Sequence, residues 1–250
     1  MKPPQFEYHA PTSVGEVCER LAQLDDAKVL AGGQSLVPLL NFRLARPAHL
    51  VDINRVAGMD RIYERDGGVA IQALARQSAV EDSDLVGRVC PLLADAERLV
   101  AHRVIRNRGT VCGSLAHADP ASELPAVILA LGGHVVARSV RGERVIQAED
   151  LFRGVMETAL APDELLVEAW FPASPPAFAI VEESRRHGDF AIAGAVRAGD
   201  RLALFGVAPT VVLADPGDPT ASLQPSGDLE ATTEFRLHLV RVLTEKVFAA

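Results

Sequence analysis

Along the first 55 residues of the chain, apolar residues at helical spacing alternate with short apolar runs that are typical of buried strands. Apolar residues recur at helical spacing behind Ser13 and Glu16, which form the S-x-x-E pattern of a capping box. These apolar residues are Val14, Val17, Leu21 and Leu24. Short apolar runs at residues 28–31 and 49–53 predict buried strands, and residues 36–43 predict a short helix. With a further strand before Ser13, the order strand, helix, strand, helix, strand predicts a small α/β unit.

Strand patterns continue between residues 61 and 172. Asp66-Gly67-Gly68 separates two of them and is a hairpin signal. A helix is predicted over residues 91–101, and another begins near Glu123 with Ser122 as its cap. The predicted strands cover residues 61–65, 69–74, 135–137, 144–147 and 165–171. Prolines at 172, 175 and 176 then indicate a boundary.

The last section of the chain predicts a small sheet followed by a helix. Its three expected strands cover residues 178–184, 190–197 and 201–208. Residues 216–228 are rich in Pro, Gly, Asp and Ser, which predicts a flexible loop. A helix is predicted over residues 229–248, with an apolar side formed by Phe235, Leu239, Val242 and Val247.

The composition excludes several classes of protein. The 250 residues are 48% apolar and 23% charged, as in ordinary globular domains. A net charge of −8 argues against a nucleic-acid-binding surface. No apolar run approaches the roughly 20 residues that span a bilayer, and the N-terminus lacks the apolar stretch of a signal peptide. We therefore expect a cytoplasmic protein with no membrane span and no nucleic-acid partner.

Three cysteines, Cys18, Cys90 and Cys112, lie far apart in the sequence. Their odd number and the absence of a Cys-x-x-Cys pair argue against a disulfide framework. Because four thiolates usually hold an iron–sulfur cluster, this chain is not expected to hold one alone.

The first segment with candidate chemistry is K-V-L-A-G-G-Q-S-L, residues 28–36. Its pattern is a strand that enters a glycine turn and then a helix. Gly32 and Gly33 permit close approach of the backbone to a phosphate, and free N–H groups there attract anions. Neither G-x-G-x-x-G nor the P-loop motif occurs, so this segment alone fits a plain strand–helix turn equally well.

The second segment, residues 105–125, concentrates small and polar side chains in what we predict to be a short irregular stretch. These are Gly109, Thr110, Gly113, Ser114, His117, Asp119 and Glu123. Small residues and hydroxyls suit a tight cofactor slot, and a carboxylate can accept from ribose hydroxyls. His117 has no second histidine nearby, so we predict no metal site and no catalytic residue, and favour a turn-stabilising or cofactor-edge role.

Together these segments resemble the FAD-binding medium subunit of the molybdenum hydroxylase family, which includes carbon monoxide dehydrogenase and xanthine-dehydrogenase-type enzymes. Residues 31–38 match A-G-G-Q-S-L-x-P. Residues 105–125 match I-R-N-R-G-T-x-G-G-[NS]-x-A-H-A-D-P-x-x-[DE]-L-P, except that Cys112 stands where glycine is usual. Shorter matches, such as Asp52-Ile53-Asn54 and residues 184–191, extend the resemblance across the chain.

The resemblance implies an α+β fold in two parts. Residues 1–173 would form a two-subdomain FAD-binding domain of the vanillyl-alcohol-oxidase type, with subdomains of about 1–56 and 57–173. Residues 174–250 would form a shortened C-terminal domain with a three-stranded antiparallel sheet and helices. The shortening is expected because a Pro- and Gly-rich loop stands where the family usually has a longer stretch containing a helix.

The resemblance also assigns residues to the cofactor, FAD. One set would wrap the pyrophosphate, mostly through backbone N–H groups: Lys28, Val29, Leu30, Ala31, Gly32, Gly33, Gln34, Ser35 and Leu36. A second set would contact the phosphate side, the flavin or the adenine: Ala101, Thr110, Gly113, Ser114, Leu115, Glu123, Leu166 and Arg186. Asp189 and Phe190 would lie with Arg186 in a stretch that closes over the isoalloxazine edge.

The function implied by the resemblance is that of an electron-transfer oxidoreductase subunit. A molybdenum-pterin large subunit would oxidise the substrate, and two [2Fe–2S] clusters on a small subunit would pass electrons to the FAD of this chain. An external acceptor would then take them. Three alternatives stay open: a self-sufficient FAD-dependent oxidoreductase, a non-catalytic assembly subunit that has lost FAD, and a generic α/β domain with coincidental motifs.

Overall fold

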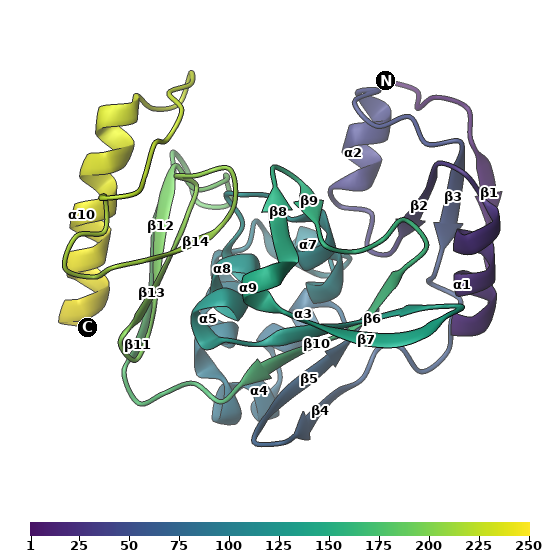
Figure 1. Cartoon of the computed structure of the whole chain (residues 1–250), viewed down its shortest axis with the longest axis horizontal. Coiled ribbons are helices and arrows are strands. Elements are labelled where there is room, and N and C mark those ends of the chain that lie inside the picture. Colours follow the sequence, from purple (N-terminus) through teal and green to yellow (C-terminus); the bar gives the residue numbers. More distant parts are fainter.

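The N-terminal unit is a three-stranded parallel sheet in a computed structural model that describes all 250 residues (Figure 1). Its strands, in the order β1-β3-β2, are β1 (Glu7–His9), β2 (Ala27–Leu30) and β3 (His49–Asp52). Helices α1 (Val14–Gln23) and α2 (Leu36–Asn41) form the two crossovers. Ser13 Oγ accepts from the Glu16 N–H at 3.2 Å, and the Glu16 carboxylate accepts from the Thr12 N–H at 2.7 Å. The predicted capping and α/β order are confirmed, with the carboxylate reaching one residue beyond the cap.

The second unit contains a five-stranded antiparallel sheet with the order β4-β5-β10-β6-β7. The strands are β4 (Ile62–Arg65), β5 (Gly68–Gln72), β6 (His134–Ser139), β7 (Gly142–Gln147) and β10 (Leu165–Pro172). Asp66 and Gly67 join β4 to β5, and both have a positive φ, of 50° and 72°. This is the backbone geometry that a two-residue hairpin requires, as the sequence predicts.

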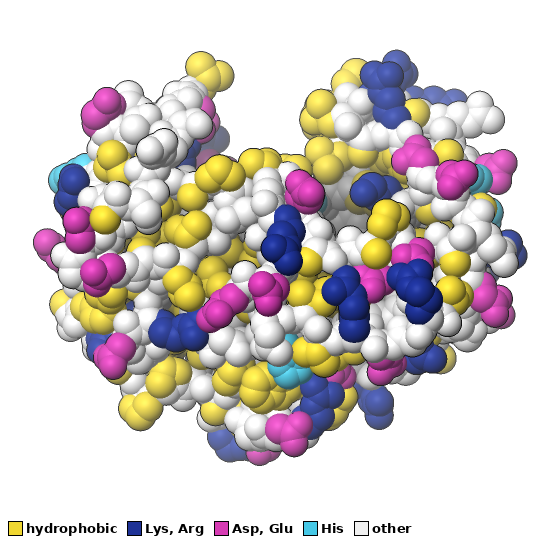
Figure 2. All heavy atoms as spheres, viewed as in Figure 1, with side chains coloured by type: hydrophobic (Ala, Val, Ile, Leu, Met, Phe, Trp, Pro, Cys, Tyr) yellow, Lys and Arg dark blue, Asp and Glu magenta, His cyan; other side chains and the backbone are white.

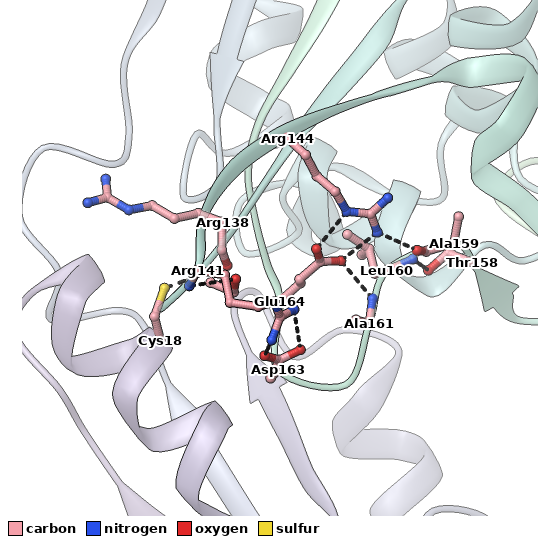
Figure 3. Close-up of polar contacts among 11 residues, drawn as sticks. Cys18, Arg138, Arg141, Arg144, Thr158, Ala159, Leu160, Ala161, Asp163 and Glu164 are labelled. Carbon is pink, nitrogen blue, oxygen red and sulfur yellow. Dashed lines mark hydrogen bonds and ion pairs between the residues drawn. The ribbon is translucent and has the colours of Figure 1, made fainter.

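Ion pairs from β7 and from the β6–β7 turn fasten the β6–β7 hairpin to the loop that precedes β10 (Figure 3). The Arg144 guanidinium donates to both carboxylate oxygens of Glu164, at 2.6 and 2.7 Å, and Arg141 pairs with Asp163. The hydrogen bonds from Arg144 lower the pKa of the Glu164 carboxyl. On the same hairpin, the Cys18 thiol of α1 lies 3.6 Å from the Arg138 carbonyl oxygen, which links the first two units.

Short helices fill the rest of the second unit. They are α3 (Gln77–Glu81), α4 (Asp84–Val89), α5 (Pro91–Leu99), α6 (Arg103–Arg106), α7 (Val111–His117), α8 (Glu123–Leu131) and α9 (Ala148–Leu151), with a small hairpin of β8 (Phe152–Gly154) and β9 (Glu157–Thr158). The prediction of an irregular stretch over residues 105–125 is wrong, because α6, α7 and the start of α8 occupy it. Helices of four to seven residues carry too little periodic signal to predict, and tertiary packing fixes them.

The C-terminal unit is a four-stranded antiparallel sheet covered by one helix (Figure 1). Its elements are β11 (Phe178–Glu183), β12 (Ala193–Ala198), β13 (Arg201–Phe205), β14 (Val212–Ala214) and α10 (Thr233–Ala249). The sequence predicts only three strands, because β14 has just three residues, which pair with β13. The prediction of several helices here is also wrong, since only α10 occurs.

Helix α10 differs from its predicted start and its predicted apolar side. It begins at Thr233 because the Thr232 hydroxyl accepts from the Phe235 N–H at 3.2 Å. Phe235 is 44% exposed, so it does not belong to the packed side. The buried face instead carries Arg236, Leu239, Val240, Leu243, Thr244 and Val247. These positions follow the three- and four-residue spacing of a helix face more closely than the predicted set.

One hydrophobic core connects all three units. It extends from Val17 in α1, through α8, to Phe205 in β13. Residues 123–130 of α8 are all buried, and this helix contacts β10 on one side and β12 and β13 on the other. The predicted boundaries near residues 56 and 173 fall between the sheets and stay predictions. No helix combines the length and the apolar character that a bilayer crossing requires.

Candidate functional site

The candidate site is a cavity of about 520 Å³ between α2, the turn after β2, and helices α6 to α8. Figure 2 shows the surface hollowed between the N-terminal and C-terminal units, where these elements meet. Twelve of the residues that the sequence predicts line this cavity: Lys28, Ala31, Gly32, Gly33, Gln34, Ser35, Leu36, Ala101, Thr110, Gly113, Ser114 and Glu123. Two segments about 75 residues apart in the sequence therefore form one site.

Five predicted residues lie outside the lining. Val29 and Leu30 belong to β2 and are partly buried, so only their backbone could serve a ligand. Leu115 and Leu166 are core side chains, 0% and 5% exposed. Arg186 is exposed in the loop between β11 and β12. Their roles toward a cofactor stay predictions.

The two glycine-containing segments touch through backbone atoms. A Cβ atom on Gly32 would lie 2.3 Å from the Arg108 carbonyl oxygen and 2.8 Å from the Gly109 Cα. A Cβ atom on Gly109 would lie 2.1 Å from Gln77 Oε1. A side chain at Gly32 would push the two segments apart, and one at Gly109 would displace Gln77, so the glycines let the two turns close one side of the cavity.

The turn after β2 presents unpaired donors to the cavity. The backbone N–H groups of Gly32, Gly33, Gln34 and Ser35 donate to no other group of the protein. Gly33 has a φ of +74°, which turns the backbone at the centre of this run. Consecutive free N–H groups in such a turn form a concave site that favours a phosphate or another anion. The residues present therefore suit a dinucleotide pyrophosphate.

A side-chain network that the sequence does not predict holds both segments in place. Arg76 donates to the Arg108 carbonyl oxygen and to Asn54 Oδ1, both at 2.7 Å. Asn54 in turn donates to the Ala31 carbonyl oxygen at 2.8 Å. The match at residues 52–54 points to Asn54, whereas no local pattern marks Arg76. Arg76 is thus a positioning residue that connects the first segment, through Asn54, to the second.

The sequence also does not predict several other residues that line the cavity. Gln77 is 4% exposed and its N–H donates to the Gly109 carbonyl oxygen at 3.0 Å, while Met156 reaches the cavity from the β8–β9 hairpin. The predicted cap Ser122 makes no capping hydrogen bond. Its hydroxyl instead lies 3.1 Å from the Ser114 hydroxyl, and both residues line the cavity.

Burial controls the charge of the cavity wall. It raises the pKa of the Glu123 carboxyl to about 8, so this group is protonated at neutral pH and can donate a hydrogen bond. Burial also lowers the pKa of His117, which favours the neutral ring. Behind the wall, burial raises the pKa of Glu97 well above its usual range, and the neighbouring Glu123 carboxyl adds to that shift.

This pKa shift predicts a pH dependence of stability. The folded chain holds the Glu123 proton up to about pH 8, whereas the unfolded chain releases it near the ordinary value of 4.5. The free energy of unfolding should therefore fall as the pH rises from about 5 to about 8. Glu123→Gln should reduce this slope by on the order of 1 kcal/mol per pH unit in urea titrations. Exposed Glu64→Gln is the control, and an equal slope in both variants would contradict the assignment.

A second cavity of about 910 Å³ lies against the first. The two share Asp119, Gly188, Asp189 and Phe190 in their linings. Phe190 is 68% exposed although it is a large apolar residue. A Cβ atom on Gly188, whose φ is +90°, would lie 2.6 Å from the ring of His102, the residue that precedes α6, so the segment packs directly against that ring. Residues 188–190 thus form a partition between the cavities.

Known proteins share this architecture. A family profile described as "FAD binding domain in molybdopterin dehydrogenase" matches residues 4–174. The 6-hydroxypseudooxynicotine dehydrogenase complex subunit alpha of Paenarthrobacter nicotinovorans is 50% identical over 78% of this chain and 67% of its own length. The carbon monoxide dehydrogenase medium chain of Hydrogenophaga pseudoflava is 40% identical over 87% of this chain and 80% of its own length.

Solved structures agree with the sequence comparisons. Carbon monoxide dehydrogenase from Hydrogenophaga pseudoflava superposes with a TM-score of 0.94 at 34% identity, covering 100% of this chain and 98% of that chain. Quinoline 2-oxidoreductase from Pseudomonas putida 86 superposes with a TM-score of 0.93 at 32% identity, and the match covers 100% of this chain and 97% of that chain.

Fold and site together define a flavoprotein domain whose cofactor is FAD. The chain belongs to the family of FAD-binding domains of molybdopterin dehydrogenases. It is a medium subunit of the molybdenum hydroxylase type, and hence an oxidoreductase subunit. The predicted family, fold type and cofactor are confirmed.

Proposed function

We propose that this chain takes electrons from [2Fe–2S] clusters of a small partner subunit and passes them to an external acceptor. A molybdenum-pterin large subunit would supply the electrons from its substrate. The observation that supports this function best is the pair of adjoining cavities, one with a lining that suits a dinucleotide and the other beside it. The three cysteines are buried and separate, which is consistent with cluster ligands on another chain.

The first cavity would hold FAD, which supplies two-electron redox chemistry when bound. The free N–H groups of residues 32–35 would bind its pyrophosphate, and Thr110, Gly113 and Ser114 would line the phosphate side. The protonated Glu123 carboxyl would donate to an acceptor atom of the cofactor.

The second cavity would admit the external acceptor. Its lining includes the acidic residues Asp119, Asp189, Asp228 and Glu230. The one cation, Arg236, donates to Asp228 and to the carbonyl oxygens of Ile192 and Gly206. Because this lining is net negative, it disfavours an anionic dinucleotide and favours a neutral acceptor such as a quinone.

The test of this function begins with a visible spectrum of the purified chain and mass analysis of the released ligand. Bound FAD, co-purification with an iron–sulfur subunit, and reduction of the FAD by a [2Fe–2S] protein would support the proposal. Oxidation of an organic substrate by the chain alone would favour the self-sufficient enzyme. A colourless chain that refuses FAD, even in the co-expressed complex, would favour the assembly subunit.

Removal of the Phe190 side chain should open the partition between the cavities. In the chain with chemically reduced FAD, Phe190→Ala should speed reoxidation by a neutral quinone severalfold, because the acceptor then reaches the cofactor more freely. Stopped-flow absorbance measures this rate. Phe42→Ala removes a similarly exposed ring, 63% exposed and outside both cavities, and should leave the rate unchanged. An altered flavin spectrum with an unchanged rate would contradict the role of Phe190.

A further inference from the structure

A cluster of two histidines and a carboxylate lies on the N-terminal sheet, apart from both cavities. In the β1–β3 register, Glu7 is opposite His49, and His9 follows two residues after Glu7. Since side chains alternate across a strand, the three project from one face of the sheet. The turn that binds FAD leaves β2 beyond Leu30, which is opposite Asp52 at the other end of β3.

The ligand atoms of this cluster converge at distances that suit a metal ion. His9 Nε2 lies 3.2 Å from His49 Nδ1, and Glu7 Oε2 lies 3.5 Å from His49 Nδ1 and 4.0 Å from His9 Nε2. Ligands about 2.0–2.1 Å from a tetrahedral Zn²⁺ are themselves about 3.3 Å apart. The two nitrogens already have this spacing, and only the carboxylate needs to move inward.

The exposure of the three side chains matches that requirement. Both histidine side chains are 19% exposed, so packing restricts the nitrogen pair. The Glu7 side chain is 74% exposed and can close on an ion at little cost. Solvent can also reach the cluster from the carboxylate side, which leaves room for water as a fourth ligand.

We propose that Glu7, His9 and His49 bind one divalent transition-metal ion, of the Zn²⁺ and Cu²⁺ class, with a fourth position open to water. Two imidazoles and one carboxylate select such ions over Mg²⁺ and Ca²⁺, which prefer oxygen ligands. The ion fastens the three-residue edge strand β1 to the central strand β3. His9 and His49 are 40 residues apart in the sequence, so no short motif with metal-ligand spacing indicates this site.

Metal binding by the full-length chain tests this inference, after removal of any histidine tag and treatment with a chelator. Equilibrium dialysis should give one Zn²⁺ per chain, and Co²⁺ should produce the visible absorption of a low-coordinate site. Zn²⁺ should also raise the unfolding temperature, because it binds the folded sheet alone. None of these readouts depends on electron transfer or on bound FAD.

Ligand variants identify the site. His49→Ala should weaken Zn²⁺ binding by at least about 100-fold, and exposed Glu7→Gln, which leaves the fold intact, by about 10-fold. The chain offers a matched control in His102 and His187, whose rings lie 5.8 Å apart without a converging carboxylate. The double variant His102→Ala, His187→Ala should bind Zn²⁺ as the unchanged chain does.

Two results would overturn the inference. One is the absence of stoichiometric Zn²⁺ binding by the unchanged chain, in which case the histidines are only hydrogen-bonded to each other. The other is binding that survives both Glu7→Gln and His49→Ala, which would place the ion elsewhere. Circular dichroism of each variant shows that a loss of binding is not a loss of fold.

Discussion

Gly33→Val should lose FAD, with its affinity for the cofactor reduced by at least about 100-fold, because the loss of two charge-assisted hydrogen bonds costs about 3 kcal/mol. Gly33 lies in the run of free N–H groups and has a φ of +74°, where a β-branched side chain is strained. A Cβ atom there would lie 3.1 Å from the Val37 side chain and 3.2 Å from the Leu30 side chain. The turn would have to change shape and withdraw its donors.

Gly58→Val is the matched control for this experiment. Gly58 has a φ of +75°, so valine imposes the same backbone strain, but no atom lies within 4 Å of a Cβ there and the residue is outside the cavity. Both variants should lose stability in thermal unfolding because of the shared backbone strain, and only Gly33→Val should lose FAD in spectral titrations. Full FAD occupancy in Gly33→Val would refute the pyrophosphate assignment. Gly113→Val tests the second segment, since its Cβ would lie 2.6 Å from Thr110 Oγ1.

Arg76→Ala should reduce FAD affinity by on the order of 100-fold, although Arg76 does not line the cavity, since two hydrogen bonds from a charged group contribute about 3 kcal/mol. The substitution removes the donors to Arg108 and Asn54, so the two segments lose the side-chain network that links them, and only their backbone contact at Gly32 is left. Titration of the FAD-free chain with FAD measures the effect.

Arg76→Lys separates positioning from simple charge. Lysine keeps the positive charge but cannot span both acceptors with one planar group, so the affinity should stay low. Recovery of affinity in Arg76→Lys would show that the charge attracts the phosphates directly. Arg88→Ala, which removes an exposed arginine paired with Glu64, should bind FAD normally.

The sequence predicts the parts of the fold that repeat regularly. The capping box at Ser13, the Asp66-Gly67 hairpin and the long buried strand β10 are all recovered, because each has a local signal of period or turn chemistry. Strand β14 and helices α6 and α7 are missed, because they owe their structure to neighbours rather than to pattern. The hydroxyl of Thr232 fixes the start of α10. The prediction does not recognise this cap and therefore begins the helix four residues too early, at residue 229.

The residues of the candidate site also differ in whether a local sequence signal marks them. Glycine turns have a strong local signature, so most of the residues that face the cavity are predictable from two motifs. Arg76, Gln77 and Met156 come from elements outside both motifs and reach the site only through the fold. The cluster of Glu7, His9 and His49 is a further case, since strand register alone brings it together.

The burial of α8 along residues 123–130 limits how the molecule can move. This helix packs between β10 of the flavin domain and β12 and β13 of the C-terminal sheet, inside a continuous core. A hinge rotation of the C-terminal unit would expose that core to water, so the two units should behave as one rigid body and melt in one cooperative transition. Under the proposed function, access to the flavin would then depend on the short 188–190 segment, which lines both cavities, and gating would be a local loop movement rather than a domain closure.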